Sequence, residues 1–240
     1  MNILSIDTFF NGRIKVRQHR HGYRFSIDAI LLAHHVTPRP GDRILDLGTG
    51  CGIIALILAY RCPDIDIVGI EVQKELAEVA ALNVKENFLE DRICIVCDDL
   101  KAVGSDAIPR PVNIIVSNPP YRQANSGRIN PNRQKAVARH EIEATLTDFV
   151  KAAHRLLQKS GRLVTIYPAE RTVDLIAEMR YLDIEPKFLR MIHSTQDKPA
   201  KLILVEGRRG ARRGTMVGPP LVIYDQDGSY TSPVQKMFQP

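Results

Sequence analysis

A short apolar segment that runs directly into a glycine-rich loop constrains the fold of this 240-residue chain more than any other feature. Residues 43–47 have the pattern of a buried strand, and the next residues, Gly48-Thr49-Gly50-Cys51-Gly52, carry the chain into a helical segment. Glycines at such a turn let the backbone bend sharply and approach a ligand closely. In open α/β sheets, ligands bind at the carboxyl ends of strands, so the loop predicts a binding site there.

The remainder of the chain alternates between strand-like and helix-like segments. We expect strands at residues 43–47, 65–70, 92–97, 112–117, 162–167, 188–192 and 201–205, and helices at residues 27–35, 52–60, 74–87, 146–158 and 169–181. This alternation predicts an α/β fold with a doubly wound, mostly parallel, seven-stranded sheet. Only residues 193–200 join the last two strands, which is too few for a helical crossover, so the last strand should be antiparallel.

We expect three parts along the chain. Residues 1–40 form a basic segment and a short helix that covers the ligand site, and residues 41–206 form the main domain. Residues 207–240 begin with a Gly/Arg linker and end in a hairpin around Asp227-Gly228, packed on the same domain.

The positive charge of the chain is concentrated in three segments. The net charge is +6, but residues 1–24, 122–140 and 207–213 together carry +13, so the remainder is acidic. An acidic body with basic segments favours an anionic partner, nucleic acid first, although three solvated loops would give the same pattern.

Composition excludes several other classes of protein. A hydrophobic content of 44% is too high for a disordered chain, and no apolar run approaches the roughly 20 residues of a membrane helix. The N-terminus lacks the features of a signal peptide, and four cysteines fit a reduced compartment, so we expect a cytoplasmic protein. Cys94 and Cys97 have the spacing of half a zinc site, but no second pair exists, so no metal is expected.

Acidic residues follow the predicted strands beside the glycine loop. Glu71 ends the second strand, where a carboxylate can accept hydrogen bonds from ribose hydroxyls, and Asp98-Asp99 ends the third. With Asp46, this pattern resembles the class I S-adenosylmethionine-dependent methyltransferases, and NAD or NADP binding is the alternative. The resemblance implies that the cofactor is bound by Asp46, Gly48, Gly50, Glu71, and Asp98 or Asp99.

The most specific motif is Ser117-Asn118-Pro119-Pro120-Tyr121 at the end of the fourth strand. A generic Asn-Pro turn is the alternative, but it gives no reason for the aromatic residue that follows. The motif resembles that of methyltransferases acting on the amino group of adenine, on cytosine N4 or on the glutamine amide. The resemblance implies that the Asn118 side-chain oxygen and the Pro119 carbonyl accept the two N–H groups of the target. Tyr121 would stack on its plane, Pro120 would lie against it, and Asn118 would also border the cofactor.

From about Arg13 to Val205 the chain resembles the tRNA (adenine-N6) methyltransferase group. The resemblance includes Gly22 to Leu32, within which Asp28 is expected to lie over the cofactor. Residues 122–139 depart from the enzymes of that group that act on valine tRNA, so the identity of the RNA stays open. Arg122, Arg128 and Arg133 in this stretch are expected to contact RNA phosphates, and an unliganded lid is the alternative.

These observations predict a monomeric, S-adenosylmethionine-dependent methyltransferase that forms N6-methyladenine in tRNA. Its catalytic residues would be Asn118, Pro119 and Tyr121. The rivals are a protein glutamine methyltransferase and a catalytically idle RNA-binding module on the same fold. A helical domain before the glycine loop, as in release-factor methyltransferases, has no room in the 45 residues that precede Asp46.

Overall fold

The computed structural model describes residues 4–20, 24–104, 108, 112–119 and 144–240. Its centre is a mixed sheet in which the order of the longer strands is β5-β4-β3-β6-β7-β9-β8. Their bounds are β3 (Arg43–Leu47), β4 (Asp66–Glu71), β5 (Ile93–Cys97), β6 (Val112–Ser117), β7 (Leu157–Pro168), β8 (Ile184–His193) and β9 (Ala200–Arg209). Neighbouring strands from β5 to β7 pair parallel, and β9 pairs antiparallel with both β7 and β8. The predicted α/β fold with a mostly parallel sheet and an antiparallel last strand is confirmed.

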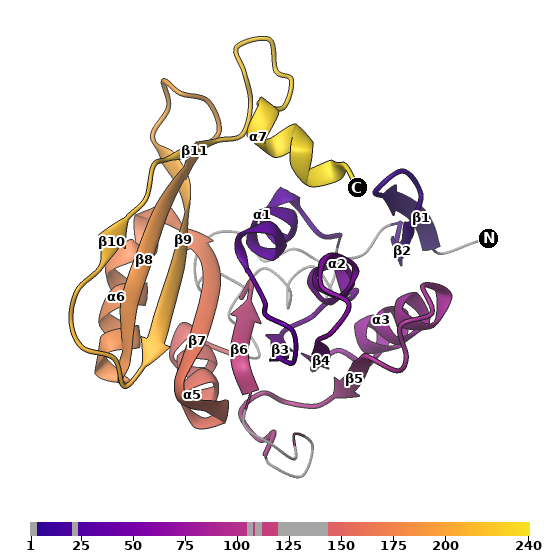
Figure 1. Ribbon diagram of the computed structural model, residues 1–240, viewed down its shortest axis with the longest axis horizontal. Coiled ribbons are helices and arrows are strands. Elements are labelled where there is room, and N and C mark those ends of the chain that lie inside the picture. Colours follow the sequence, from indigo (N-terminus) through magenta and orange to yellow (C-terminus); the bar gives the residue numbers. More distant parts are fainter. Residues whose placement is uncertain (1–3, 21–23, 105–107, 109–111, 120–143) are drawn as a thin grey trace.

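Helices cover both faces of this sheet (Figure 1). One face packs against α1 (Ile27–His35), α2 (Ile53–Arg61) and α3 (Lys74–Glu86), and the other against α5 (Leu146–Leu156) and α6 (Thr172–Tyr181). The strand β3 is apolar on both faces because it contributes to both cores: Ile44 belongs to the first, whereas Leu45 and Leu47 belong to the second. No helix in the described part of the chain is long and apolar enough to cross a membrane.

An N-terminal hairpin of β1 (Leu4–Phe9) and β2 (Ile14–His19) was not expected from the sequence. It is attached to α3 by two asparagines one helical turn apart. The side chain of Asn83 accepts a hydrogen bond from the N–H of Arg17 (2.7 Å) and donates to its carbonyl (2.9 Å). Asn87 makes the same pair of bonds with the backbone of Lys15 (2.9 and 2.7 Å). The two amides therefore replace the strand that the outer edge of β2 lacks.

The C-terminal segment runs along β8 and returns to the N-terminal hairpin (Figure 1). Two short strands, β10 (Met216–Val217) and β11 (Leu221–Val222), pair with β8, and α7 (Ser232–Gln235) follows. An antiparallel bridge joins Tyr224 to Tyr230. Beyond it, Phe238 stacks on Phe9 of β1, with ring centroids 6.2 Å apart. The two ends of the described chain therefore share one aromatic cluster.

Several expectations differ from the structure. The predicted seven-stranded sheet has nine strands in the described part of the chain, because β10 and β11 pair with β8, and the strand expected at residues 188–192 already begins at Ile184. The helix predicted for residues 146–158 ends at Leu156, because the chain turns into β7 at Leu157, well before Gly161. The stretch from Gly207 was predicted as a linker, but β9 continues to Arg209. There the backbone pairs with both β7 and β8, and Gly207 is buried so closely against Met179 that a Cβ at this position would clash with the Met179 methyl group.

Candidate active site

The sequence-predicted site residues meet at one edge of the sheet. Asn118 follows β6, Asp46 lies near the end of β3, Glu71 ends β4, and Asp98 follows β5. These four strands are neighbours in the sheet, with Leu47 level with both Ser117 and Ile70. Because parallel strands place their carboxyl ends on the same edge, segments from four parts of the chain form one row.

The glycine loop folds tightly over the end of β4. Gly48, Gly50 and Gly52 have φ angles of +73°, +61° and +84°, a region that residues with a Cβ rarely adopt. The N–H groups of Gly48 and Thr49 both donate to the carbonyl of Ile70, at 2.9 and 3.0 Å. The left-handed turns therefore point backbone N–H groups at β4 and bring the chain to the start of α2.

Asp46 is completely buried beneath this loop. Its Oδ2 accepts a hydrogen bond of 2.6 Å from the Thr49 hydroxyl, whereas its Oδ1 has no partner among the described residues. The pKa of the Asp46 carboxyl is raised to about 7: burial is the main cause, the Thr49 hydrogen bond opposes it, and the nearby Glu71 charge adds to it. An unpaired buried oxygen is costly and marks a position where a ligand donor would be stabilising.

Glu71 connects the loop to the segment after β4. Its Oε2 accepts the N–H of Gly50 (2.9 Å) and its Oε1 accepts the N–H of Gln73 (3.0 Å). Burial raises the pKa of this carboxyl, and the backbone hydrogen bonds oppose that effect. Each carboxylate oxygen keeps a second lone pair, so Glu71 is able to accept further hydrogen bonds from two neighbouring hydroxyls.

Asp98 and Asp99 differ in how their carboxylates are used. The N–H of Asp98 donates to the Glu71 carbonyl (3.1 Å), which places Asp98 beside the end of β4. Asp99 accepts the N–H of Lys101 (2.9 Å) and lies 3.3 Å from its ammonium group. The Asp98 carboxylate accepts the N–H of Asp99 (2.7 Å), so both acids hold their own turn, but only Asp99 also lies against a lysine.

The backbone before Asn118 is held from both sides. The Ser117 hydroxyl donates to the Leu47 carbonyl of β3 (3.0 Å), and the Ser117 carbonyl accepts the Thr165 hydroxyl of β7 (2.9 Å). The Asn118 side chain is half-buried and makes no hydrogen bond to the described residues. Its amide is therefore available to a ligand, and its position is fixed by neighbours rather than by its own contacts.

Phe149 joins the Asn118 segment to the glycine loop. It lines a small apolar cavity together with Ser117, Pro119 and Thr165, and a Cβ added to Gly48 would lie 3.7 Å from its ring. The helix that carries it begins with a capping box, in which Thr145 and Asp148 each accept the other's backbone N–H. The Phe149 ring therefore lies against both the Asn118-Pro119 segment and the glycine loop.

Some predicted site residues lie outside the described residues: Pro120, Tyr121, Arg122, Arg128 and Arg133. Asp28 is described, in the first turn of α1, a helix that packs against α2. Burial raises the pKa of its carboxyl, and a hydrogen bond with the Ser26 side chain opposes that effect.

Sequence reasoning missed the residues that hold the site in place: Thr49, Asn83, Phe149 and Thr165. Asn83 is fully buried and, besides its bonds to Arg17, donates to the Cys51 carbonyl in the glycine loop (2.8 Å). The available signal was a polar residue on the apolar face of a helix, since Asn83 follows Val79 and Ala80 at helical spacing.

The fold and the glycine-loop site define a class I S-adenosylmethionine-dependent methyltransferase. The family model of the methyltransferase small domain matches residues 24–180, and the chain belongs to this family. A relative from Porphyromonas gingivalis, named tRNA1(Val) (adenine(37)-N6)-methyltransferase, is 30% identical over 98% of this chain and 94% of its own length. A relative of the same name from Trichodesmium erythraeum is 31% identical over 80% of each chain.

Solved structures agree on the fold. A predicted O-methyltransferase from Agrobacterium tumefaciens superposes with a TM-score of 0.72 at 21% identity, over 88% of this chain and 94% of that one. The enzyme in a complex of aTrm5 with tRNALeu superposes with a TM-score of 0.59 at 16% identity, over 87% of this chain and 54% of that one. At these identities the likeness concerns the fold alone.

The site fits the cofactor of this class, S-adenosylmethionine. The unpaired Oδ1 of Asp46 is an acceptor without a donor, and Gly48 at the start of the loop is exposed and has no side chain to block a ligand. The spare lone pairs of Glu71 suit a ribose diol. A loop of this kind, with a carboxylate at the end of the next strand, is the arrangement by which doubly wound folds hold nucleosides.

Proposed function

We propose that this chain methylates the exocyclic amino group of an adenine in tRNA. The observation that carries the proposal is the Asn118-Pro119 segment at the end of β6, which shares the Phe149 wall with the glycine loop. The names of the relatives support the choice of acceptor, because they specify N6 of adenine 37 in a valine tRNA. We place the reaction in the cytoplasm, with the protein acting as a monomer.

We propose the following residues for the cofactor. Glu71 accepts the two ribose hydroxyls, and the Gly48–Gly50 backbone lies against the amino-acid portion. Asp46, through its free Oδ1, receives a donor from the same portion. Asp98 receives the adenine amino group in preference to Asp99, whose carboxylate is engaged by Lys101. Asp28 and Asn118 border the cofactor from opposite sides.

The acceptor chemistry follows from the weak nucleophilicity of a conjugated amine. When bound, the cofactor supplies an electrophilic methyl group attached to positively charged sulfur. The Asn118 oxygen and the Pro119 carbonyl accept the two N–H groups, which favours a tetrahedral nitrogen and directs its lone pair at the methyl carbon. Transfer would form a nitrogen–carbon bond in place of the sulfur–carbon bond, and the nitrogen, held by Asn118 and Pro119, would then lose its proton to water. This requires no side-chain base before transfer.

The substrate side extends beyond the described residues. We propose that Tyr121 stacks on the adenine, a contact that is typically worth about 1–3 kcal/mol for a nucleobase. Pro120 would lie beside that ring, and Arg122, Arg128 and Arg133 would contact phosphates. An adenine in a structured loop must leave its stack to reach Asn118.

The test is methyl transfer to defined acceptors. The purified protein is incubated with methyl-labelled S-adenosylmethionine and an unmodified valine tRNA transcript, the same transcript with guanine at position 37, or a release factor. We expect N6-methyladenosine, identified by mass spectrometry, in the first transcript only. Label in the release factor alone would instead assign a glutamine methyltransferase and overturn the proposal.

A variant links that activity to the proposed residue. Because Asn118 makes no hydrogen bond within the described chain, Asn118→Ala should fold normally and keep its thermal transition. We expect kcat to fall about 10²–10³-fold, as when one positioned hydrogen-bonding group is removed from a catalytic site. Asn87→Ala, an asparagine far from this edge, is the control and should keep full kcat. Undiminished kcat in the Asn118 variant would contradict the mechanism.

A further inference from the structure

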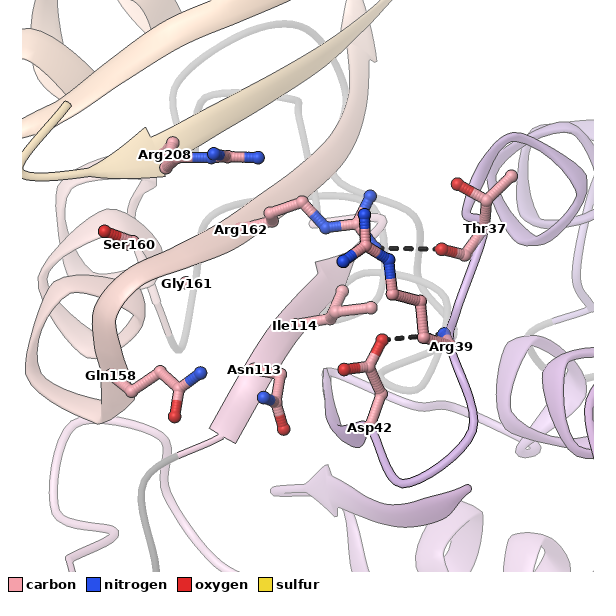
Figure 2. Close-up of a pocket in the computed structure, with 10 residues that line it drawn as sticks. All are labelled: Thr37, Arg39, Asp42, Asn113, Ile114, Gln158, Ser160, Gly161, Arg162 and Arg208. Carbon is pink, nitrogen blue, oxygen red and sulfur yellow. Dashed lines mark hydrogen bonds between the residues drawn. The ribbon is translucent and has the colours of Figure 1, made fainter. Parts of the chain in front are cut away.

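A second, basic cavity lies at the opposite edge of the sheet from the glycine loop (Figure 2). Its volume is about 270 Å³, and it lies at the amino ends of β3, β6 and β7. The strands are five or six residues long here, so about 15–20 Å separate this cavity from the proposed methylation site. The lining residues are Thr37, Arg39, Asp42, Asn113, Ile114, Gln158, Ser160, Gly161, Arg162 and Arg208.

An irregularity in β7 opens this space. The pairing of β6 with β7 passes from Val112–Leu157 directly to Ile114–Arg162, so residues 158–161 bulge out opposite the single residue Asn113. Ser160 in the bulge has a φ of +63°, in the left-handed region that non-glycine residues rarely occupy. A strained backbone of this kind persists only where the surrounding structure holds it, and Ser160 lies in the wall of the cavity.

Three arginines from different elements reach this cavity. Arg39 comes from the segment before β3, Arg162 from β7 and Arg208 from β9 (Figure 2). The guanidinium groups of Arg39 and Arg208 make no hydrogen bond or ion pair to the described residues. Arg162 donates to the Thr37 carbonyl (2.9 Å) and lies 3.5 Å from Glu206, which orients its guanidinium and leaves other N–H donors free.

The lining contains three arginines and one acid, Asp42, and no ion pair joins Asp42 to an arginine among the described residues. The Asp42 carboxylate accepts the backbone N–H of Arg39 (2.8 Å) and so closes its own turn. Burial, followed by the charges of Arg190 and Arg162, lowers the pKa of the nearby His35 to about 4. The lining amides of Asn113 and Gln158 and the hydroxyl of Ser160 add neutral donors.

We infer that this cavity binds a phosphate group. Planar guanidinium groups bind phosphate through paired N–H donors, and a phosphate with its water shell suits a polar cavity of this size. The phosphate could belong to the backbone of a bound RNA or to a free phosphorylated small molecule, and the chemistry of recognition is the same for both. The inference does not depend on which acceptor the enzyme methylates.

The test compares Arg39→Gln/Arg208→Gln with Arg212→Gln/Arg213→Gln. Both double variants remove two positive charges, but Arg212 and Arg213 are exposed and do not line the cavity. Inorganic phosphate is titrated at constant ionic strength against chloride, and its binding is followed by ³¹P NMR line broadening and by the thermal transition. With the wild type and the control, we expect the ³¹P signal of phosphate to broaden and the thermal transition to rise. The cavity variant should bind phosphate at least tenfold more weakly.

A second arm identifies the source of the phosphate. Binding of unmodified tRNA is measured as a function of salt concentration. If the phosphate belongs to RNA, the cavity variant binds tRNA several-fold more weakly than the control, with a shallower salt slope by about one unit per lost contact. If it belongs to a small molecule, the two variants bind tRNA alike while phosphate binding still differs. Equal phosphate binding by wild type, cavity variant and control would overturn the inference.

Discussion

Asp46 shows how the environment of one side chain sets both stability and binding at this site. Folding removes its carboxyl from water and supplies one hydroxyl donor, from Thr49, for two oxygens. Its folded pKa of about 7 lies above the ordinary 3.8, so the folded chain retains a proton that the unfolded chain has lost. The contribution of this group to stability therefore declines as pH rises from about 4 to about 7.

We predict that Asp46→Asn abolishes this pH dependence. The variant should gain about 2–3 kcal/mol in the free energy of unfolding, relative to wild type, between pH 5 and pH 8. Urea unfolding at both pH values measures the gain. Asp66→Asn, at the exposed start of β4, is the control and should differ from wild type by the same amount at both pH values. A constant difference for Asp46→Asn as well would rule out the burial effect.

At this scale the sequence predicted where Asp46, Glu71, Asp98 and Asn118 lie, because each one follows or ends a recognisable strand. It did not predict that Thr49 bonds to Asp46, or that Asp99 turns to Lys101. Those contacts depend on the exact path of the loops after β3 and β5. Side-chain choices among several nearby donors are set by distances that spacing along the chain does not contain.

At the scale of elements, the hairpin β1–β2, the helix α3 and the glycine loop are coupled through Asn83. Its amide bonds to both backbone groups of Arg17 and to the Cys51 carbonyl, and all of these bonds are made by a fully buried side chain. Removing that amide leaves backbone groups unpaired, and unpaired buried groups cost about 1–3 kcal/mol each.

We predict that Asn83→Ala lowers the free energy of unfolding by about 2–4 kcal/mol and weakens S-adenosylmethionine binding. The second effect follows because Cys51 lies in the glycine loop and loses its anchor on α3. Denaturant unfolding and calorimetric titration of the cofactor measure the two effects. Asn87→Ala also loosens the hairpin but does not contact the loop, so its cofactor Kd should stay at the wild-type value. An unchanged Kd for Asn83→Ala would disprove the coupling.

The elements of the central sheet could be predicted because each buried strand is an apolar run between glycines or charged residues. The hairpin β1–β2 was not predicted because its strands, LSIDTF and IKVRQH, contain charged residues. The segment was therefore interpreted by its positive charge rather than by its strand pattern. The early start of β7 was also missed, since residues 158–161 bulge and interrupt the regular pairing. Pairing partners from distant parts of the chain decided both cases.

Across the described part of the molecule, the N-terminal basic segment and the one from Gly207 play different roles. In the N-terminal segment, Arg17 pairs with Glu86 (2.8 Å) and Arg24 with Asp7 (2.9 Å), so part of its charge is used inside the fold. In the segment from Gly207, Arg208 lines the basic cavity and Arg209 donates to the Leu157 carbonyl. Charge counted along the sequence therefore overstates what is available to an anionic partner.

The aromatic cluster at the two ends of the described chain provides a test at this scale. Phe238 contacts both Phe9 and Tyr230, with ring centroids 6.2 and 5.3 Å apart. We predict that Phe238→Ala lowers the free energy of unfolding by about 1–3 kcal/mol, since the ring is only partly buried, and speeds amide exchange in β1. Hydrogen-exchange mass spectrometry measures the second effect. Phe88→Ala, at a ring that is 90% exposed, is the control and should change neither quantity.

The same contact has a consequence for how the protein is made. Among the residues described here, Phe9 is synthesised early and Phe238 almost last. The hairpin β1–β2 therefore lacks its contact with Phe238 while the residues between them are synthesised. The nascent sheet can assemble before that moment, because its strands and helices emerge in sequence. Contact between the N-terminal hairpin and Phe238 must then follow the emergence of residue 238 from the exit tunnel, after every strand of the central sheet has emerged.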